Sequence, residues 1–155
     1  MAIRQIVQIG DETLRKRSFE VVNFDNKLAS LLDDMRDTLK KSGGVGLAAP
    51  QVGILRRIFI VEVEENKIIE FINPTIIKQS GSQTGEEGCL SVIGKYGIVT
   101  RPDKVKIKAF DRFGNEFEYL GVGFNARALC HEYDHLDGII YVDKAEELYS
   151  ERRWE

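Results

Sequence analysis

The two histidines of this chain lie four residues apart, in "HEYDH" at residues 131–135. Residues i and i+4 share one face of a helix, so His131 and His135 can direct ring nitrogens at one ion. A metal site that performs chemistry takes three protein ligands and leaves one coordination position open. Because the chain has no third histidine, the third ligand is either Cys89, in "EEGCLS", or a carboxylate. The sequence therefore predicts a catalytic metal site built on a helix.

The two sequence neighbours of His131 differ in what they can contribute. Cys130 points roughly 100° away from His131 on a helix of 3.6 residues per turn, so it cannot complete the site. Glu132 cannot bind the same ion directly, but its carboxylate can overhang the open coordination position. There it can take a proton from an attacking water and pass it to a leaving amine. We therefore predict that Glu132 is a general acid and base.

Hydrophobic spacing and capping residues indicate the helices near the N-terminus. A short helix is expected over residues 11–17, and a longer one over residues 25–42, where leucines and Met35 recur at helical spacing. Asp25 is placed to cap the longer helix, and Gly43-Gly44 to end it.

The histidine motif is itself expected on a helix from Phe124 to Asp137, with Asn125 as a possible cap and Gly138 as its stop. The tail over residues 144–155, "KAEELYSERRWE", is expected to form one more short helix.

The middle of the chain has the pattern of a β protein. A glycine-rich stretch, "GGVGLAAPQVG" at residues 43–53, suits a loop or an irregular strand. Beyond it, β-branched residues alternate or cluster, which predicts strands, and "DRFGNE" is a hairpin turn. The strand segments are "RRIFIVEVEE", "KIIEFINPTIIKQSG", "YGIVTRP", "DKVKIKAFD" and "EFEYLGVG". No alternating strand-helix rhythm occurs, so we predict an α+β fold over residues 1–155, one domain of mostly antiparallel β-sheets packed around the C-terminal helix that carries the histidine motif.

Bulk composition excludes several classes of protein. Apolar content of 43% and charged content of 30% are those of a globular chain. The balance of 22 basic and 25 acidic side chains does not suggest a nucleic acid or an anionic membrane as a partner. The N-terminus lacks the layout of a signal peptide, and the longest apolar runs are too short to cross a bilayer. Two cysteines in such a chain are expected to be thiols, and we expect a cytoplasmic protein.

Three stretches together match one family. They are "GVGLAAPQ" at residues 44–51, "EGCLS" at residues 87–91 and "HEYDHLDG" at residues 131–138. In order and rough spacing they resemble the three motifs of bacterial peptide deformylases, which remove the formyl group from the N-terminal methionine of new proteins. The similarity extends from "DETLRKRS" near the start to "KVKIKAFDRFGNEFE" before the last helix.

The resemblance implies a role for each motif residue. It makes Cys89, His131 and His135 the metal ligands and Glu132 the acid and base. It implies that the Gln51 side chain and the Leu90 backbone N–H hold the developing oxyanion, and preorganised neutral donors are what such a transition state needs. The implied native ion is Fe2+, with Zn2+, Ni2+ or Co2+ able to occupy the same ligands. The implied partners are N-formylmethionyl peptides of nascent chains, with transient proximity to the ribosome.

The methionine pocket, by the same resemblance, draws on Val45, Phe124 and Ala128, and Gly46 offers its carbonyl to the substrate amide. Glu87 and Arg101 are similar to family positions and are expected to pair with each other beside the site. One departure is Cys130, where many members have glutamine; we expect it to change packing and leave the chemistry intact.

Two other functions fit parts of the pattern. A zinc endopeptidase would use the same histidine motif with a distant histidine or carboxylate, which the lack of a third histidine and the presence of "EGCLS" oppose. A non-catalytic metal-binding module would need a fourth protein ligand, and the helix position of Cys130 opposes that.

Overall fold

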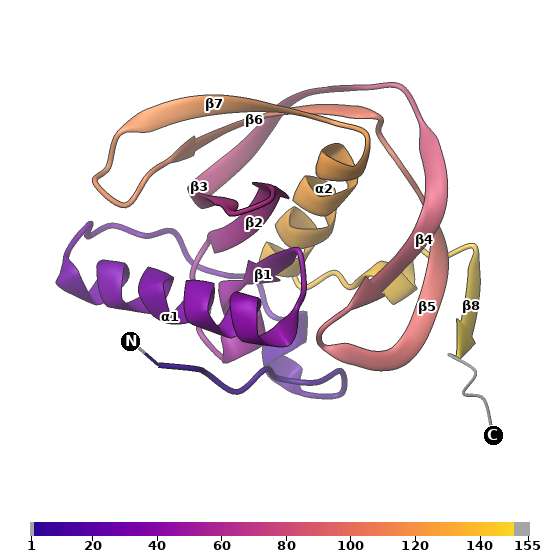
Figure 1. Cartoon of the computed structure of the whole chain (residues 1–155), viewed down its shortest axis with the longest axis horizontal. Coiled ribbons are helices and arrows are strands. Elements are labelled where there is room, and N and C mark those ends of the chain that lie inside the picture. Colours follow the sequence, from indigo (N-terminus) through magenta and orange to yellow (C-terminus); the bar gives the residue numbers. More distant parts are fainter. Residues whose placement is uncertain (1, 151–155) are drawn as a thin grey trace.

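Two antiparallel sheets and two α-helices make up the α+β fold in the computed structural model, which describes residues 2–150 (Figure 1). The α-helices are α1 (Asn26–Ser42) and α2 (Phe124–Leu136), and short 3-10 helices are η1 (Glu12–Arg15), η2 (Ala49–Val52) and η3 (Tyr141–Asp143). The strands are β1 (Gly46–Ala48), β2 (Ile58–Glu64), β3 (Lys67–Ser80), β4 (Gln83–Cys89), β5 (Val92–Arg101), β6 (Lys104–Phe110), β7 (Glu116–Val122) and β8 (Glu147–Ser150). Neither α1 nor α2 is both long enough and apolar enough to cross a membrane.

The chain passes twice, without an intervening helix, between the two sheets. The five-stranded sheet has the order β1-β2-β3-β6-β7, and the three-stranded sheet has the order β4-β5-β8. The chain passes from β3 into β4 at Gly81, whose φ is 73°, and returns from β5 into β6 beside it, where the Asp103 N–H donates to the Ser80 carbonyl (3.0 Å). Figure 1 shows the resulting ribbon curving from one sheet into the other around α2.

Strand β2 is buried on both faces because a helix covers each face of its sheet. Ile58 and Ile60 point toward the core cluster that contains α1, whereas Phe59 and Val61 point toward the cluster that contains α2. This double burial accounts for the continuous apolar run of this strand, since an alternating pattern requires one solvated face.

Helix α1 forms as its sequence predicts. The Asp25 side chain accepts the Leu28 N–H at 3.1 Å, and Gly43 ends the helix in the left-handed conformation at φ 74°. The predicted leucine and methionine stripe packs against the sheet in one core cluster.

Helix α2 is confirmed, but the predicted cap is wrong. Gly123 (φ 62°, ψ −123°) is the N-cap, a backbone conformation that glycine adopts without a Cβ penalty. Asn125 lies inside the helix, where its side-chain amide donates to the Val63 carbonyl at 3.1 Å and so ties α2 to the end of β2.

Two expectations about the other elements need correction. The predicted tail helix is wrong over its described part, because residues 147–150 form β8 and pair with β5, Glu147 opposite Ile98; residues 151–155 lie outside the described residues. Strand β4 was not expected, since "QTGEEGC" has no apolar alternation. The predicted hairpin turn is confirmed, with the Asp111 carboxylate accepting the N–H groups of Phe113 and Asn115.

Candidate metal centre

Three potential metal ligands from two elements converge at the end of β4. The ligand atoms of Cys89, His131 and His135 lie within 4.8 Å of one another, and Cys89 Sγ is 3.4 Å from His135 Nε2. Cys130, as expected, does not join them. It is buried in the core cluster on the other side of α2, where burial raises the pKa of its thiol to about 11. The geometry thus favours Cys89 over Cys130 as the partner of the two histidines.

The charges at the two histidines fit a bound cation. Burial alone lowers the pKa of His131, yet its contacts with Cys89 and Glu87 raise it well above its usual range, so the surroundings favour positive charge there. Burial lowers the pKa of His135 well below its usual value, which keeps the lone pair of its ring available. His131 binds Glu87 through Nδ1 (2.8 Å), which leaves its Nε2 for an ion. These residues therefore fit a divalent metal.

Glu132 lies beside the three ligands, and its side chain is buried. Its Oε1 is buried with no hydrogen-bond partner among residues 2–150, and burial raises the pKa of the carboxyl to about 7. Its other oxygen packs against Gly46 so closely that a Cβ on this glycine would lie 2.6 Å from Oε2. A side chain at position 46 would therefore displace the Glu132 carboxylate.

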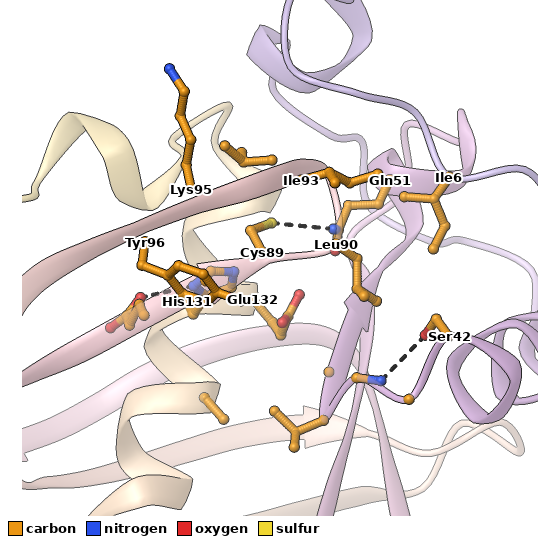
Figure 2. A pocket seen from close by; sticks show the side chains of 18 of the residues that line it. Ile6, Ser42, Gln51, Cys89, Leu90, Ile93, Lys95, Tyr96, His131 and Glu132 are labelled. Carbon is orange, nitrogen blue, oxygen red and sulfur yellow. Dashed lines mark hydrogen bonds and ion pairs between the residues drawn. The ribbon is translucent and has the colours of Figure 1, made fainter. Parts of the chain in front are cut away.

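The Gln51 side chain is held at both ends, in the wall facing Cys89 (Figure 2). Its Oε1 accepts the Ala48 N–H at 2.9 Å, which fixes the amide so that Nε2 points toward the site. That Nε2 donates to Ser91 Oγ at 3.0 Å and to Cys89 Sγ at 3.6 Å. A donor is therefore presented to the space next to the cysteine sulfur.

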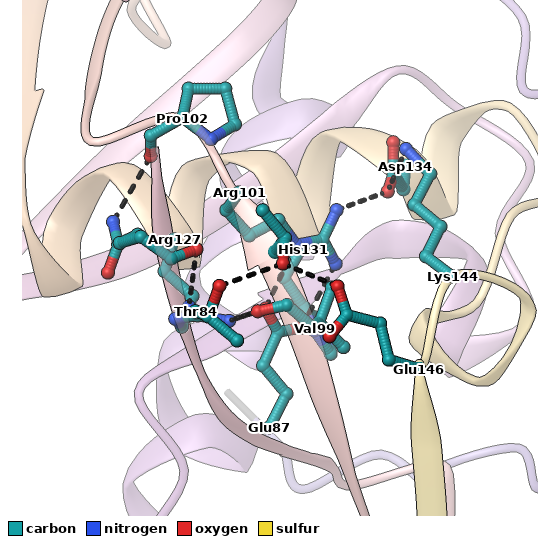
Figure 3. Close-up of polar contacts among 12 residues, drawn as sticks. Thr84, Glu87, Val99, Arg101, Pro102, Arg127, His131, Asp134, Lys144 and Glu146 are labelled. Carbon is teal, nitrogen blue, oxygen red and sulfur yellow. Dashed lines mark hydrogen bonds and ion pairs between the residues drawn. The ribbon is translucent and has the colours of Figure 1, made fainter. Parts of the chain in front are cut away.

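Beneath His131 lies a buried network centred on Glu87 (Figure 3). The Glu87 carboxylate accepts from Arg101 Nε (2.9 Å) and Nη2 (3.0 Å), from Arg127 Nη1 (2.6 Å) and from His131 Nδ1. The expected pairing of Glu87 with Arg101 is confirmed. Burial opposes the charge on Glu87, but the hydrogen bonds with His131 and Arg101 lower its pKa overall. Arg101 also reaches α2 through Asp134 at 2.7 Å.

Two residues of the site were not identified from the sequence. Arg127 stands one helical turn before His131, and this i to i+4 spacing was the available signal. Ser91, the last residue of "EGCLS", is fully buried, and its hydroxyl receives the Gln51 amide. Arg127 binds Glu87 and Ser91 binds Gln51, and both of these partners had been identified from the sequence.

The predicted pocket residues line one cavity of about 670 Å³. Val45, Gly46, Phe124 and Ala128 share this cavity with Gln51, Glu87, Cys89, Leu90, His131 and Glu132. Phe124 is 61% exposed and Val45 43% exposed, whereas Ala128 is buried. The apolar side chains thus extend from the surface to the candidate metal ligands.

Comparisons with known proteins agree with this geometry. The family model described as polypeptide deformylase matches residues 3–151. The peptide deformylase of Lachnoclostridium phytofermentans is 55% identical over 146 residues, covering 93% of this chain and 90% of the relative. That of Caldicellulosiruptor bescii is 52% identical, covering 100% of this chain and 93% of the relative.

Solved structures show the same fold. The crystal structure of a peptide deformylase from Legionella pneumophila superposes with a TM-score of 0.91 at 44% identity, covering 94% of this chain and 87% of that one. The structure from Thermotoga maritima gives a TM-score of 0.92 at 36% identity, covering 95% of this chain and 100% of that one. With the family model spanning almost all of its residues, the chain belongs to the polypeptide deformylase family.

Proposed function

We propose that this chain removes the formyl group from N-formylmethionyl peptides, releasing formate and a free amino terminus, with one divalent ion held by Cys89, His131 and His135. The observation that carries the proposal is the convergence of these three ligand atoms within 4.8 Å, beside the buried Glu132 carboxylate, in a chain of the deformylase family. Proteins named peptide deformylase share about half of its residues.

The donor set suits a borderline transition metal. One thiolate and two imidazoles accept Fe2+, Zn2+, Co2+ or Ni2+, and we propose Fe2+ as the native ion on the family resemblance. When bound, such an ion supplies a Lewis acid that polarises the formyl carbonyl and makes water a better nucleophile.

Glu132 moves the protons. A carboxyl whose pKa is raised to about 7 by burial can both accept and release a proton near neutral pH. We assign it the proton of the attacking water, and then delivery of a proton to the departing amine nitrogen. The unpartnered Oε1 supports this role, since a buried carboxylate oxygen without a hydrogen bond is costly unless a ligand or water completes it.

Gln51 and Leu90 stabilise the charge that develops on the formyl oxygen. Gln51 Nε2 already points toward Cys89 Sγ, and the Leu90 N–H belongs to the peptide unit that directly follows this cysteine. Fixed neutral donors of this kind contribute about 10²–10³ in kcat when they meet an oxyanion.

The cavity positions the peptide. Val45, Phe124 and Ala128 offer an apolar wall to the methionine side chain, and Gly46 offers its carbonyl to the substrate amide. This use of Gly46 is supported by its position on β1, an edge strand that pairs with β2 on one side only.

Glu87 and Arg101 support the site from below. The carboxylate orients the His131 ring through Nδ1, and the arginine orients the carboxylate.

Because the substrates are nascent chains, we place the enzyme transiently near the ribosome, in the cytoplasm.

The test uses three peptides. Formyl-Met-Ala, acetyl-Met-Ala and an unblocked longer peptide are incubated with the metal-loaded protein, and formate, acetate and internal cleavage are measured. We expect formate from the first peptide alone, because the acetyl methyl group adds bulk where Gln51 and Leu90 must close on the carbonyl. Internal cleavage of the unblocked peptide without formate release would instead identify an endopeptidase.

A further inference from the structure

Residues 6–9 form a segment, here named the N-terminal strap, that crosses behind both proposed oxyanion donors. The Val7 N–H donates to the Gln51 carbonyl at 2.7 Å, and the Ile9 N–H donates to the Ser91 carbonyl at 2.8 Å. Between them, the Gln8 side-chain amide donates to the Leu90 carbonyl at 3.0 Å. One short stretch of chain therefore contacts the backbone on both sides of the oxyanion position.

The two donors belong to separate parts of the fold. Gln51 lies on η2, directly after β1 of the five-stranded sheet, and Leu90 lies in the turn between β4 and β5 of the three-stranded sheet. Their spacing is thus not set by any single helix or sheet. The Gln51 side chain reaches the β4–β5 turn directly, through Ser91 Oγ and Cys89 Sγ. The strap adds backbone contacts, because it bonds the Gln51 carbonyl on one side and the Leu90 and Ser91 carbonyls on the other.

The strap is itself anchored on both sides. Ile6 packs against the core cluster of α1, and Val7 packs against the cluster that contains Val92 and Tyr141. Ile6 and Gln8 also line the cavity, and Figure 2 shows Ile6 in the wall near Gln51. Packing against both core clusters limits the movement of the strap relative to each of them.

We infer that the N-terminal strap sets the relative position of the Gln51 amide and the Leu90 N–H, with Gln8 as a positioning residue. This inference rests on the proposed function, since it presumes that these two groups hold the oxyanion. Gln8 holds the Leu90 carbonyl, which belongs to the peptide unit after Leu90. The Leu90 N–H belongs to the preceding peptide unit and is joined to the held unit through the Leu90 Cα, so a shift of the held unit moves this Cα and displaces the N–H from the formyl oxygen. A displacement of about 1 Å at a reacting centre costs as much as 10²-fold in rate.

The experiment compares three variants of exposed glutamines in the full-length, metal-loaded protein. Gln8→Met keeps the length of the side chain and removes the donor, Gln8→Lys keeps a donor, and Gln5→Met is the matched control in the same segment. We expect Gln8→Met to lower kcat for formyl-Met-Ala about three- to tenfold, the range of one modest hydrogen bond, with KM, metal content and Tm unchanged. Gln8→Lys should recover most of the loss, and Gln5→Met should behave as the parent protein.

A second measurement separates positioning from general loosening. Affinity is compared for the product Met-Ala and for a peptide whose formyl group is replaced by a tetrahedral H-phosphonate. Gln8→Met should weaken the tetrahedral mimic by the same factor as kcat and leave the product affinity unchanged. Unchanged kcat, or equal weakening of both peptides, overturns the inference.

Gln51→Ala distinguishes this failure from failure of the proposed function. If Gln51→Ala lowers kcat and Gln8→Met does not, the strap has no positioning role while the oxyanion assignment holds. If Gln51→Ala leaves kcat unchanged, the oxyanion assignment itself is wrong and the inference falls with it.

Discussion

Replacing Glu87 by glutamine should damage both the metal site and the fold. Oε1 of Glu87 accepts from His131 Nδ1 and Arg101 Nη2, and Oε2 accepts from Arg101 Nε and Arg127 Nη1. A carboxamide has one oxygen and one NH2 group, so either orientation turns a donor toward two donors. His131 can relieve its own clash only by accepting at Nδ1, which places its proton on Nε2, where the ion must bind.

The expected magnitudes follow from these contacts. Glu87 and Arg101 are both nearly buried, and removing one partner of a buried ion pair costs about 3–5 kcal/mol. Loss of the support behind a metal-binding histidine typically weakens metal binding about 10–100-fold. We therefore expect Glu87→Gln to lower the free energy of unfolding by several kcal/mol, and to weaken Co2+ binding within that range.

The assays are urea unfolding and Co2+ titration of the metal-free protein, followed by its absorption spectrum. Glu87→Asp keeps the negative charge and should lie between the parent and the glutamine variant in both measurements. Glu118→Gln is the control, because its exposed pair with Lys106 (3.1 Å) contributes less than about 1 kcal/mol. Parental Co2+ affinity in a folded Glu87→Gln protein would refute the reasoning about the histidine.

Further predictions concern single groups of the site and the fold. Cys89→Ala should abolish bound metal while Cys130→Ser leaves it near normal, as elemental analysis would show; equal losses would contradict the ligand assignment. Glu132→Gln should retain metal but lose about 10²–10⁴-fold in kcat, and a metal-free product would mean that the carboxylate supports the ion instead. Gly46→Ala should lower kcat by more than tenfold at normal metal content, because the new Cβ would lie 2.6 Å from Glu132 Oε2 and so displace the Glu132 carboxylate. An unchanged kcat would show that the Glu132 carboxylate tolerates this movement. Burial raises the pKa of Glu70, but hydrogen bonds from Arg112 and Arg36 lower this pKa overall, below its ordinary value of 4.5. The ionised Glu70 carboxylate therefore stabilises the fold above pH 4.5, and this stabilisation is lost as the pH falls through the lowered pKa. Glu70→Gln should flatten this decline of the free energy of unfolding at acid pH, as measured by urea unfolding.

Local chemistry made much of the fold predictable. Helix α1 has its apolar stripe, its Asp25 cap and its glycine end in one stretch of sequence, so all three agreed with the structure. The double-faced burial of β2 likewise matches an unbroken apolar run. In both elements, the residues that determine the structure lie within the element itself, so a local pattern predicts it.

Strands β4 and β8 could not be predicted for the opposite reason. Their residues are polar or exposed, and both are strands because β5 offers hydrogen bonds along its two edges. Such pairing depends on a neighbour that is distant in sequence, which no local pattern records.

The residues of the site also fall into those that the sequence identified and those that it did not. His131, His135 and Glu132 were identified because their residue types and spacing are specific to metal chemistry, whereas Cys89 was one of two alternatives until the family resemblance selected it. Arg127 and Ser91 were missed because an arginine on a helix and a serine in a turn are ordinary until the fold brings them to Glu87 and Gln51.

The convergence of Cys89 from β4 with the two histidines of α2 also links the ion to folding. An unfolded chain does not hold these ligands together, so an ion bound only to the native state stabilises it by about 4.1 kcal/mol at a thousand times its dissociation constant. Under the proposed ligand assignment, a bound ion would cross-link the three-stranded sheet to α2 and could be removed by a chelator. Its loss leaves the β4 end joined to α2 chiefly through the Glu87 network, so chelation should increase amide hydrogen exchange first in β4 and in the turn that follows it.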